Sequence, residues 1–301
     1  MKPLNVSLNV YKSILWVLCW SLSFSLMMVL IRKLEDRVSI PMLVYIRLIC
    51  GFLFFLPYCF SFGLANLKTS KGSFHLLRVL LYTGSMLLTF YAYAHLPMTT
   101  ATSIGFSGPI LTSFLSIFLL GERVGRLHWL FILLGYGGVL ACVGPTSIAM
   151  STAVVSSILA NLLASFSLIA MKKLTQTENL PRIMFWANFF SIILLSFGAP
   201  FFWQAPSSED LLILISLGVI GVFSQFSYIK ALVNGTPALV APFEFSRLLF
   251  AVPIGLFYFS EPFHIWTFFG GVLIIVANTG IALLSQKNNL ANSQPVHALE
   301  S

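Results

Sequence analysis

The chain has 301 residues, of which 58% are hydrophobic and only 9% are charged, against roughly 25% charged in a typical soluble domain. So few charges cannot cover the surface of a soluble protein of this size, so the composition indicates an integral membrane protein. The net charge of +8 does not indicate a nucleic-acid-binding protein, because Lys and Arg lie singly or in small groups between apolar runs.

The first apolar run, from about residue 14 to residue 31, is too long for a cleavable signal and predicts a first membrane helix. Further near-continuous apolar runs follow, and their lack of alternation excludes a membrane barrel. Polar, Gly or Pro breaks separate the runs at 32–40, 66–73, 95–98, 121–126, 144–147, 172–181, 204–210, 234–237 and 260–263. We therefore expect ten transmembrane helices.

Three prolines stand where helices are expected to begin, a position that tolerates proline: Pro41, Pro181 and Pro237. Residues 286–301 are polar and are predicted to form a disordered cytoplasmic tail. Cytoplasmic N- and C-termini place most of the 17 Lys and Arg residues inside, and leave only Arg32, Lys33 and Arg37 in outer loops. This arrangement follows the preference of positive charge for the cytoplasmic side.

The sequence repeats itself at an offset of about 139 residues. The phrase FLLGERVGRLHW at 118–129 returns as FYFSEPFHIW at 257–266, with Glu122 matched by Glu261. Other matches in the same order are Ser107 with Ser246, Phe106 with Phe245, Ala92 with Ala231, and Pro41 with Pro181. These matches predict two five-helix repeats, 1–147 and 148–285. Because five is odd, the second repeat is expected to be inverted in the membrane, as in many secondary transporters.

Three segments resemble the drug/metabolite transporter superfamily, specifically its ten-helix EamA-type carriers. They are YAYAHLPMTTATSIGFSGPILTSFLSIFLLGERVGRLHW (91–129), PALVAPFEFSRLLFAVPIGLFYFSEP (237–262) and YIRLICGFLFFLP (45–57). Arg47, LPMTTAT and APFEFSR together resemble a bacterial subgroup that includes S-adenosylmethionine uptake carriers, riboflavin carriers and metallophore exporters. The resemblance implies a multi-pass carrier of the inner membrane that moves a small organic metabolite by alternating access. S-adenosylmethionine uptake is the first expectation, and export of amino acids, metallophores or drugs is the alternative.

Glu244 and Arg247 are the leading candidates for substrate binding. They lie three residues apart on the expected ninth helix, where a charge near the membrane centre costs about 2.5–3.5 kcal/mol. Either they form a structural ion pair, or they line the cavity, with Glu244 binding a cationic group or a proton. Their counterparts in the first repeat are Gly105 and Gly108, so the charge is confined to one half.

The remaining candidates have a structural alternative in each case. Arg47 is either an anchor or a substrate contact, and Lys230 either reaches the interface or binds substrate. Aromatic side chains suit planar or cationic ligands but also serve packing. The aromatic candidates are Tyr91, Tyr93, Tyr228 and, more weakly, Trp20.

An enzyme is the remote alternative. GFSG at 105–108 matches the GxSG motif of intramembrane serine proteases, but the histidines fall at helix ends, in a loop or in the tail. The chain has no GxxxxGK[ST] phosphate-binding motif, so transport is expected to use a gradient, such as protons, or exchange. We expect no cofactor, metal or nucleic acid. The partners are a small-molecule substrate and the lipid bilayer, and a homodimer is left open.

Overall fold

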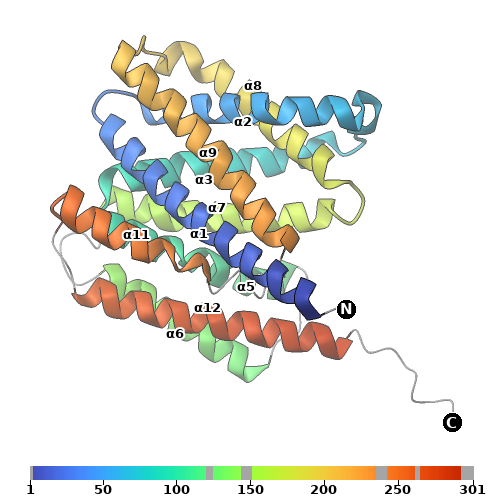
Figure 1. The fold of residues 1–301 in the computed structure, drawn as a ribbon, viewed down its shortest axis with the longest axis vertical. Coiled ribbons are helices and arrows are strands. Elements are labelled where there is room, and N and C mark those ends of the chain that lie inside the picture. Colours follow the sequence, from blue (N-terminus) through green and yellow to red (C-terminus); the bar gives the residue numbers. More distant parts are fainter. Residues whose placement is uncertain (1–2, 120–124, 144–150, 235–242, 262–264, 293–301) are drawn as a thin grey trace.

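The computed structural model describes residues 3–119, 125–143, 151–234, 243–261 and 265–292, and this part of the chain is helical without strands (Figure 1). The first half contains α1 (Pro3–Leu34), α2 (Ile40–Phe62), η1 (Leu64–Leu67), α3 (Gly72–His95), α4 (Met98–Gly105), α5 (Ser107–Leu119) and α6 (Arg126–Val143). The second half contains α7 (Thr152–Leu174), α8 (Leu180–Phe202), α9 (Ser208–Asn234), α11 (Arg247–Pro253), the π-helical turn η3 (Ile254–Tyr258) and α12 (Ile265–Asn292).

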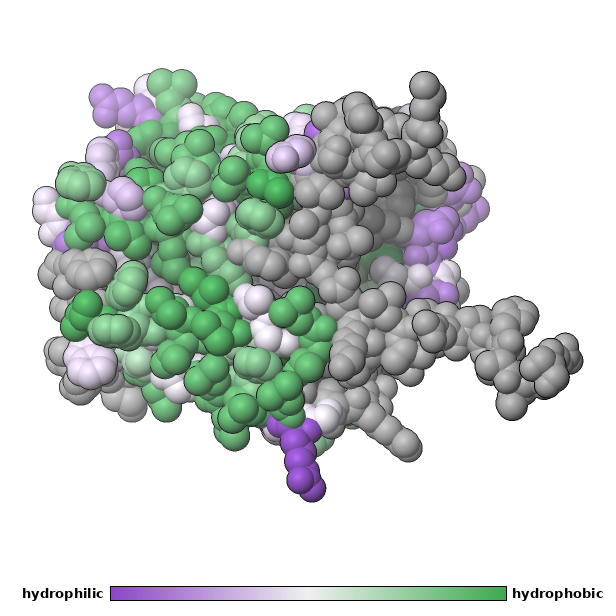
Figure 2. Space-filling model, turned by 60° about the horizontal axis from the view of Figure 1, so that its bottom comes forward, coloured by the Kyte–Doolittle hydropathy of each residue, from purple (hydrophilic) through white to green (hydrophobic). Residues whose placement is uncertain are grey.

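Within the described residues, seven helical segments are long and apolar enough to cross a membrane. They are Tyr11–Leu34, Ile40–Pro57, Gly72–His95, Met98–Leu119, Thr152–Leu174, Arg182–Phe202 and Ser208–Ala231. Three shorter apolar helices, Trp129–Ala141, Arg247–Tyr258 and Ile265–Ile281, accompany them. Figure 2 shows a broad hydrophobic face with hydrophilic residues toward its edges, as expected for a surface in contact with lipid. The predicted all-helical, multi-pass membrane class is confirmed, whereas ten crossings remain a prediction.

Two elements differ from the sequence-based expectation. The fourth expected helix is interrupted at Phe106, because Pro109 has no N–H to donate to the carbonyl of Gly105 and its ring crowds that carbonyl. The last helix continues to Asn292, so residues 286–292 are helical where a disordered tail was expected. The expected helix start at Pro237, the repeat boundary at 147–148 and Glu122 lie outside the described residues.

The repeat relates the packed helix pairs to one another. When each helix is replaced by its counterpart in the other half, one packed pair becomes another packed pair. α1 packs along α9, and the equivalent elements of the other half, α7 and α3, pack along each other. α2 contacts both α8 and α9, while α8 contacts both α2 and α3. α6 packs along α12, its own equivalent, at the lower edge of Figure 1. This reciprocity extends the repeat from the sequence to the packing.

Equivalent polar contacts also occur at opposite ends of the molecule. Arg37, after α1, donates to the Asp210 carboxylate near the start of α9, at 3.0 Å. Their repeat counterparts are Thr177, after α7, and Lys71, before α3, whose Nζ donates to the Thr177 hydroxyl at 2.8 Å. Lys71 lies at the start of α3, about 35 Å from the end of that helix at His95. Met98 follows that end of α3. Met98 and Arg32 of α1 both contact the carboxylate of Glu261, so the end of α1 lies at the same end of the molecule as His95.

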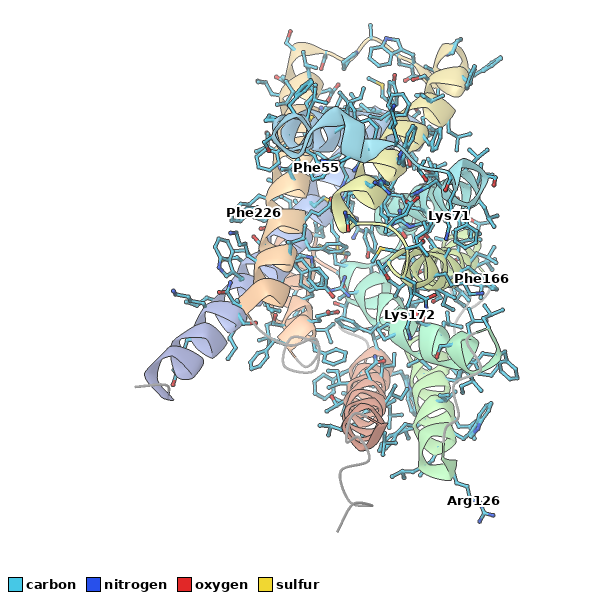
Figure 3. The ribbon with its side chains drawn as sticks, turned by 90° about the vertical axis from the view of Figure 1, so that its right-hand side faces the viewer. Phe55, Lys71, Arg126, Phe166, Lys172 and Phe226 are labelled. Atoms are coloured by element: carbon cyan, nitrogen blue, oxygen red, sulfur yellow. The ribbon has the colours of Figure 1, made fainter. Side chains whose placement is uncertain are left out.

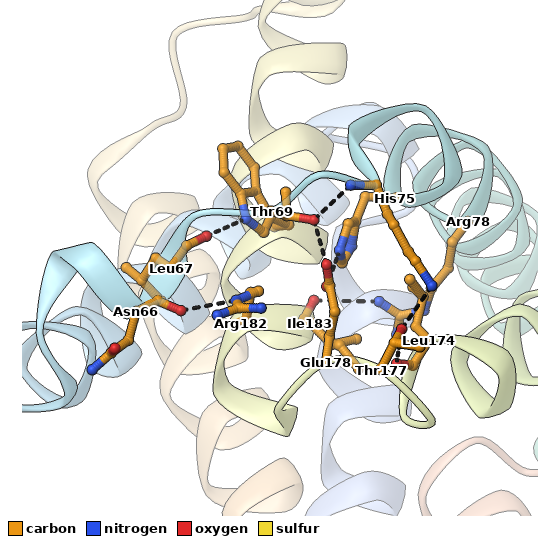
Figure 4. Close-up of polar contacts among 12 residues, drawn as sticks. Asn66, Leu67, Thr69, His75, Arg78, Leu174, Thr177, Glu178, Arg182 and Ile183 are labelled. Atoms are coloured by element: carbon orange, nitrogen blue, oxygen red, sulfur yellow. Dashed lines mark hydrogen bonds and ion pairs between the residues drawn. The ribbon is translucent and has the colours of Figure 1, made fainter.

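A polar cluster ties the α7–α8 turn to the segment before α3 (Figure 4). Thr69 donates to Glu178, and His75 Nε2 lies 2.6 Å from the other oxygen of that carboxyl group. Arg182 donates to the Asn66 carbonyl at 2.8 Å. Burial raises the pKa of Glu178, but the hydrogen bonds from Thr69 and His75 and the charges of His75 and Arg182 outweigh it. The net result is a pKa below the ordinary value of 4.5.

Glu178→Gln is expected to lower the melting temperature at neutral pH, because it removes the ionised partner of His75 and Thr69. A carboxyl group with a depressed pKa contributes its full stabilisation at pH values above its unfolded-state pKa. This contribution is lost as the pH falls through the folded-state pKa. The difference in melting temperature between wild type and variant should therefore persist down to about pH 4.5 and shrink below it. Thermal unfolding in detergent across this pH range measures it, and a difference that vanished between pH 7 and pH 5 would contradict the assignment.

Gly138→Ala should destabilise the contact between α6 and α12. A Cβ at this position would lie 2.8 Å from the backbone oxygen of Gly270 and 3.0 Å from the nitrogen of Ile274, so the helices must separate. Overpacking of this kind costs about 1–3 kcal/mol and should lower the melting temperature. Gly137→Ala is the matched control, since a Cβ there meets nothing within 4 Å. Equal melting temperatures for the two variants would refute the close approach.

Candidate functional site

The two halves each contain a helix interruption at the same place in the repeat. In the first half α4 ends at Gly105, and α5 begins at Ser107. In the second half Arg247 starts α11 after a tight turn, in which the N–H of Leu248 donates to the carbonyl of Phe245. Phe106 and Phe245, which occupy matching positions, meet edge to face with 4.8 Å between their ring centroids. Interrupted helices in corresponding positions of two repeats mark the binding region in many transporters.

Polar side chains of the first helix of each half contact the interruptions. Asn161 of α7 donates to the carbonyl of Ile104 at 2.9 Å and to the hydroxyl of Ser107 at 3.0 Å. On the other side, Ser246 donates to Ser21 of α1 at 2.7 Å. Ser21 is the repeat counterpart of Asn161, so the two contacts are equivalent. Ser107 is thus buried and bonded to a helix-packing partner, as expected for a structural residue.

Arg247 is enclosed by aromatic rings. Its guanidinium carbon lies 5.1 Å from the ring centroid of Trp20, 4.8 Å from that of Phe24 and 4.6 Å from that of Phe106. The residue is 8% exposed, and Tyr93 also interacts with it through its phenol. Guanidinium–ring contacts away from water are worth about 2 kcal/mol, which offsets part of the cost of burying the charge. We call this group the Arg247 cage.

Glu244 lies beside the cage but has a different partner. The hydroxyl of Tyr228 on α9 donates to its carboxylate at 2.7 Å, and the Tyr228 ring lies 5.1 Å from that of Trp20. Among the ion pairs of the described residues, none joins Glu244 and Arg247. Glu244 also precedes α11 instead of lying within one helix with Arg247. The structure therefore does not support the structural ion pair considered from the sequence.

The two halves differ in side-chain size around the interruptions. Small residues, Ala160 and Ala164, occupy the α7 positions that match Trp20 and Phe24 on α1. Gly108, the counterpart of Arg247, faces Asn161, whose side-chain oxygen would lie 3.7 Å from an added Cβ. Close packing thus fills the α7 side, whereas charged and aromatic side chains fill the α1 side. The candidate site therefore belongs to α1, α9 and α11, together with Tyr93 of α3 and Phe106 at the α4–α5 junction.

Three of the sequence-based candidates lie apart from the cage. Arg47 of α2 has Nη1 3.4 Å from the sulfur of Met86, and its stem packs against Gly221 of α9. Tyr91 bonds to the Thr152 hydroxyl at 3.1 Å and stacks on His95.

The third, Lys230, is exposed, with its Nζ 5.3 Å from the ring centroid of Phe226. Figure 3 shows Phe226 on the outer side of α9. Trp20, the weakest aromatic candidate from the sequence, instead contacts both Arg247 and Tyr228.

Sequence reasoning missed Phe24 and Phe106. Phe24 lies one helical turn after Trp20, and Phe106 is the repeat partner of Phe245, so both could have been found by combining helical spacing with the repeat. Neither stands out among 29 phenylalanines.

In a comparison with known protein families, the chain matches the EamA-like transporter family twice, over residues 11–144 and again over 151–284. The chain belongs to the EamA-like transporter family. Each match covers one of the two halves that the packing relates to each other. A solved crystal structure resembles this EamA-like transporter with a TM-score of 0.62 at 16% identity, covering 94% of this chain and 98% of that one, which shows a shared fold.

Several curated relatives are similar over most of their length. An S-adenosylmethionine uptake transporter of Rickettsia prowazekii (strain Madrid E) is 27% identical, over 96% of this chain and 98% of its own. The pseudopaline exporter CntI of Pseudomonas aeruginosa is 24% identical, over 85% and 91%. A riboflavin transporter of Rhizobium johnstonii is 25% identical, over 88% of each chain. These names describe transporters of small organic molecules in both directions.

Asn161→Ala should destabilise this EamA-like transporter, because it removes the donor to the Ile104 carbonyl in an apolar setting. An unsatisfied buried group costs about 1–3 kcal/mol. Asn188→Ala is the control, since Asn188 donates only to the Met184 carbonyl of its own helix, at 3.0 Å. Melting temperatures in detergent should fall for the first variant and change little for the second. A stable Asn161→Ala protein would show that the interruption does not depend on this side chain.

Proposed function

We propose that this EamA-like transporter is a secondary carrier that moves a small organic metabolite across the inner membrane by alternating access. In this proposal ten helices form two inverted repeats, 1–147 and 148–285, with both termini in the cytoplasm. The reciprocal helix pairs and the equivalent contacts Arg37–Asp210 and Lys71–Thr177 at opposite ends support the inversion. An inverted repeat supports alternating access, because its two halves can exchange conformations and open opposite ends in turn.

The observation that carries the substrate proposal is the separation of charge at the site. Glu244 and Arg247 are each held by aromatic side chains and not by an ion pair with each other. A ligand with both a cationic and an anionic group can therefore use both without breaking an existing ion pair. The neighbouring rings of Trp20, Tyr93 and Tyr228 suit a planar heterocycle and a cationic centre.

S-adenosylmethionine fits this description and is our proposed substrate. Its carboxylate would bind Arg247, its ammonium or sulfonium would approach Glu244, and its adenine would stack on the aromatic side chains. The uptake function named for the Rickettsia prowazekii relative supports the same substrate. Arg47, Tyr91 and Lys230 lie outside the cage and are not proposed to contact the ligand in this conformation.

Export is the second candidate, and the pseudopaline exporter among the relatives favours it. The fold does not select a direction, because a carrier moves substrate down whichever gradient is supplied. Glu244 would couple transport to protons if its carboxyl group were protonated in one half of the cycle, and otherwise the carrier would exchange substrates. Uptake into right-side-out and inside-out vesicles, with and without a pH gradient, distinguishes these cases.

Glu244→Gln should weaken S-adenosylmethionine binding and uptake by roughly 10-fold or more, the cost of losing a hydrogen bond to a charged group. Ligand binding raises the melting temperature of the wild type by mass action, so the thermal shift should be lost in the variant. Lys230→Gln is the matched control, on the same helix as Tyr228 but outside the cage, and should keep both the shift and the uptake.

Full uptake by Glu244→Gln would remove this carboxylate from the site. If flavins or amino acids raised the melting temperature and S-adenosylmethionine did not, the carrier proposal would stand and the proposed substrate would change.

A further inference from the structure

Glu261 joins three elements at the end of the molecule where α1 finishes. Its carboxylate accepts the backbone N–H of Met98, the first residue of α4, at 2.9 and 3.1 Å. Arg32 of α1 donates to the same carboxylate, and its guanidinium carbon lies 4.6 Å from the ring centroid of Phe259. Glu261 itself is 8% exposed and follows η3. One buried carboxylate therefore links α1, α4 and the α11–η3 segment.

The same three elements supply most of the Arg247 cage, to which α3 adds Tyr93. α1 supplies Trp20 and Phe24, the residue after α4 is Phe106, and α11 begins with Arg247. Separation of these elements at the Glu261 end would therefore open a route to the cage. In this structure Glu261 holds the three elements together.

A column of side chains on α1 connects the two places. Trp20, Phe24, Met28 and Arg32 recur every four residues, so each lies next to the one before it in a row that winds slowly around the helix. Met28 is 1% exposed, and the hydroxyl of Thr102 on α4 lies 3.7 Å from its sulfur. From Phe24 to Arg32 the column covers about 12 Å. Met28 thus fills the space between the cage and Glu261.

We infer that Glu261 is a gate residue of the transport cycle: its contact with Arg32 closes the outer route to the Arg247 cage, and the contact breaks when that side opens. The assignment of this end as the outer one rests on the proposed function. Glu35 also interacts electrostatically with Arg32, but the hydrogen bond of Arg32 goes to Glu261.

A purely structural role for Glu261 is the competing explanation, because a carboxylate at the first N–H of a helix stabilises that helix. A substitution of Arg32 distinguishes the two roles. Arg32→Gln removes the charge that holds α1 to Glu261 and leaves the carboxylate bonded to Met98. Lys33→Gln is the matched control: it makes the same change in charge at the neighbouring residue, which is exposed and lies over the ring of Tyr258.

The test is thiol accessibility of Met28→Cys in a chain whose cysteines (Cys19, Cys50, Cys59 and Cys142) are replaced by Ser. A membrane-impermeant methanethiosulfonate reagent is applied to right-side-out and to inside-out vesicles. Arg32→Gln should raise the outer labelling rate by roughly 10- to 100-fold, the range for a lost charged hydrogen bond, without raising the inner rate. Lys33→Gln should match the parent. Thr102→Cys is the second reporter, should Met28→Cys fail to fold.

Equal outer labelling in Arg32→Gln and Lys33→Gln would overturn the inference, as would an equal rise from both sides, which indicates general loosening. The proposed function fails separately. If Arg32→Gln raises the outer labelling rate but the protein does not bind S-adenosylmethionine, the gate proposal stands and the substrate proposal fails. If Glu244→Gln abolishes uptake but Arg32→Gln does not raise the outer labelling rate, the substrate-site proposal stands and the gate proposal fails.

Discussion

The backbone of a membrane helix has no water to bond with, so each interruption of a helix must be satisfied by neighbouring side chains. The rest of this structure depends on that constraint. Asn161 satisfies the interruption at Phe106, and Ser21 contacts the equivalent residue, Ser246. Because both partners come from the first helix of a repeat, the two interruptions are held at the centre of the packing. Interrupted backbone there permits side chains to converge from several helices, and the cage forms at this convergence.

The repeat supplies one framework, and the two halves use it differently. Gly108 lets α5 approach Asn161 of α7, and Gly105 faces the phenol of Tyr93. Glu244 and Arg247 instead keep the matching space on the α1 side filled with polar and aromatic groups. A buried charge must have a compensating environment. Arg247 obtains it from ring faces and Glu244 from a phenol. In the proposed function, a ligand replaces both environments with equivalent contacts.

Composition and the spacing of apolar runs were sufficient to predict the helical membrane class and most helix positions, because the membrane imposes length and polarity on each segment. The cost of intramembrane charge pointed to Glu244 and Arg247, and the structure brings both into one site with Tyr93, Tyr228 and Trp20. Their actual partners were not predictable, since the Tyr228–Glu244 bond and the three rings around Arg247 depend on how helices rotate against each other. The interruption at Phe106 was missed although Pro109 signals it, because the apolar run continues across it without a polar break.

The column on α1 has a consequence for how substrate preference can change. Trp20 and Phe24 face the cage, and Arg32, further along the same i, i+4 row, contacts Glu261. Under the proposed function, a substitution that tilts or rotates α1 should therefore alter affinity and turnover together. Tyr93 comes from α3, which is not among the elements that Glu261 joins, so it is not subject to this coupling. If the proposed function holds, divergence toward new metabolites, in nature or in the laboratory, should therefore proceed more readily through Tyr93 than through the first helix.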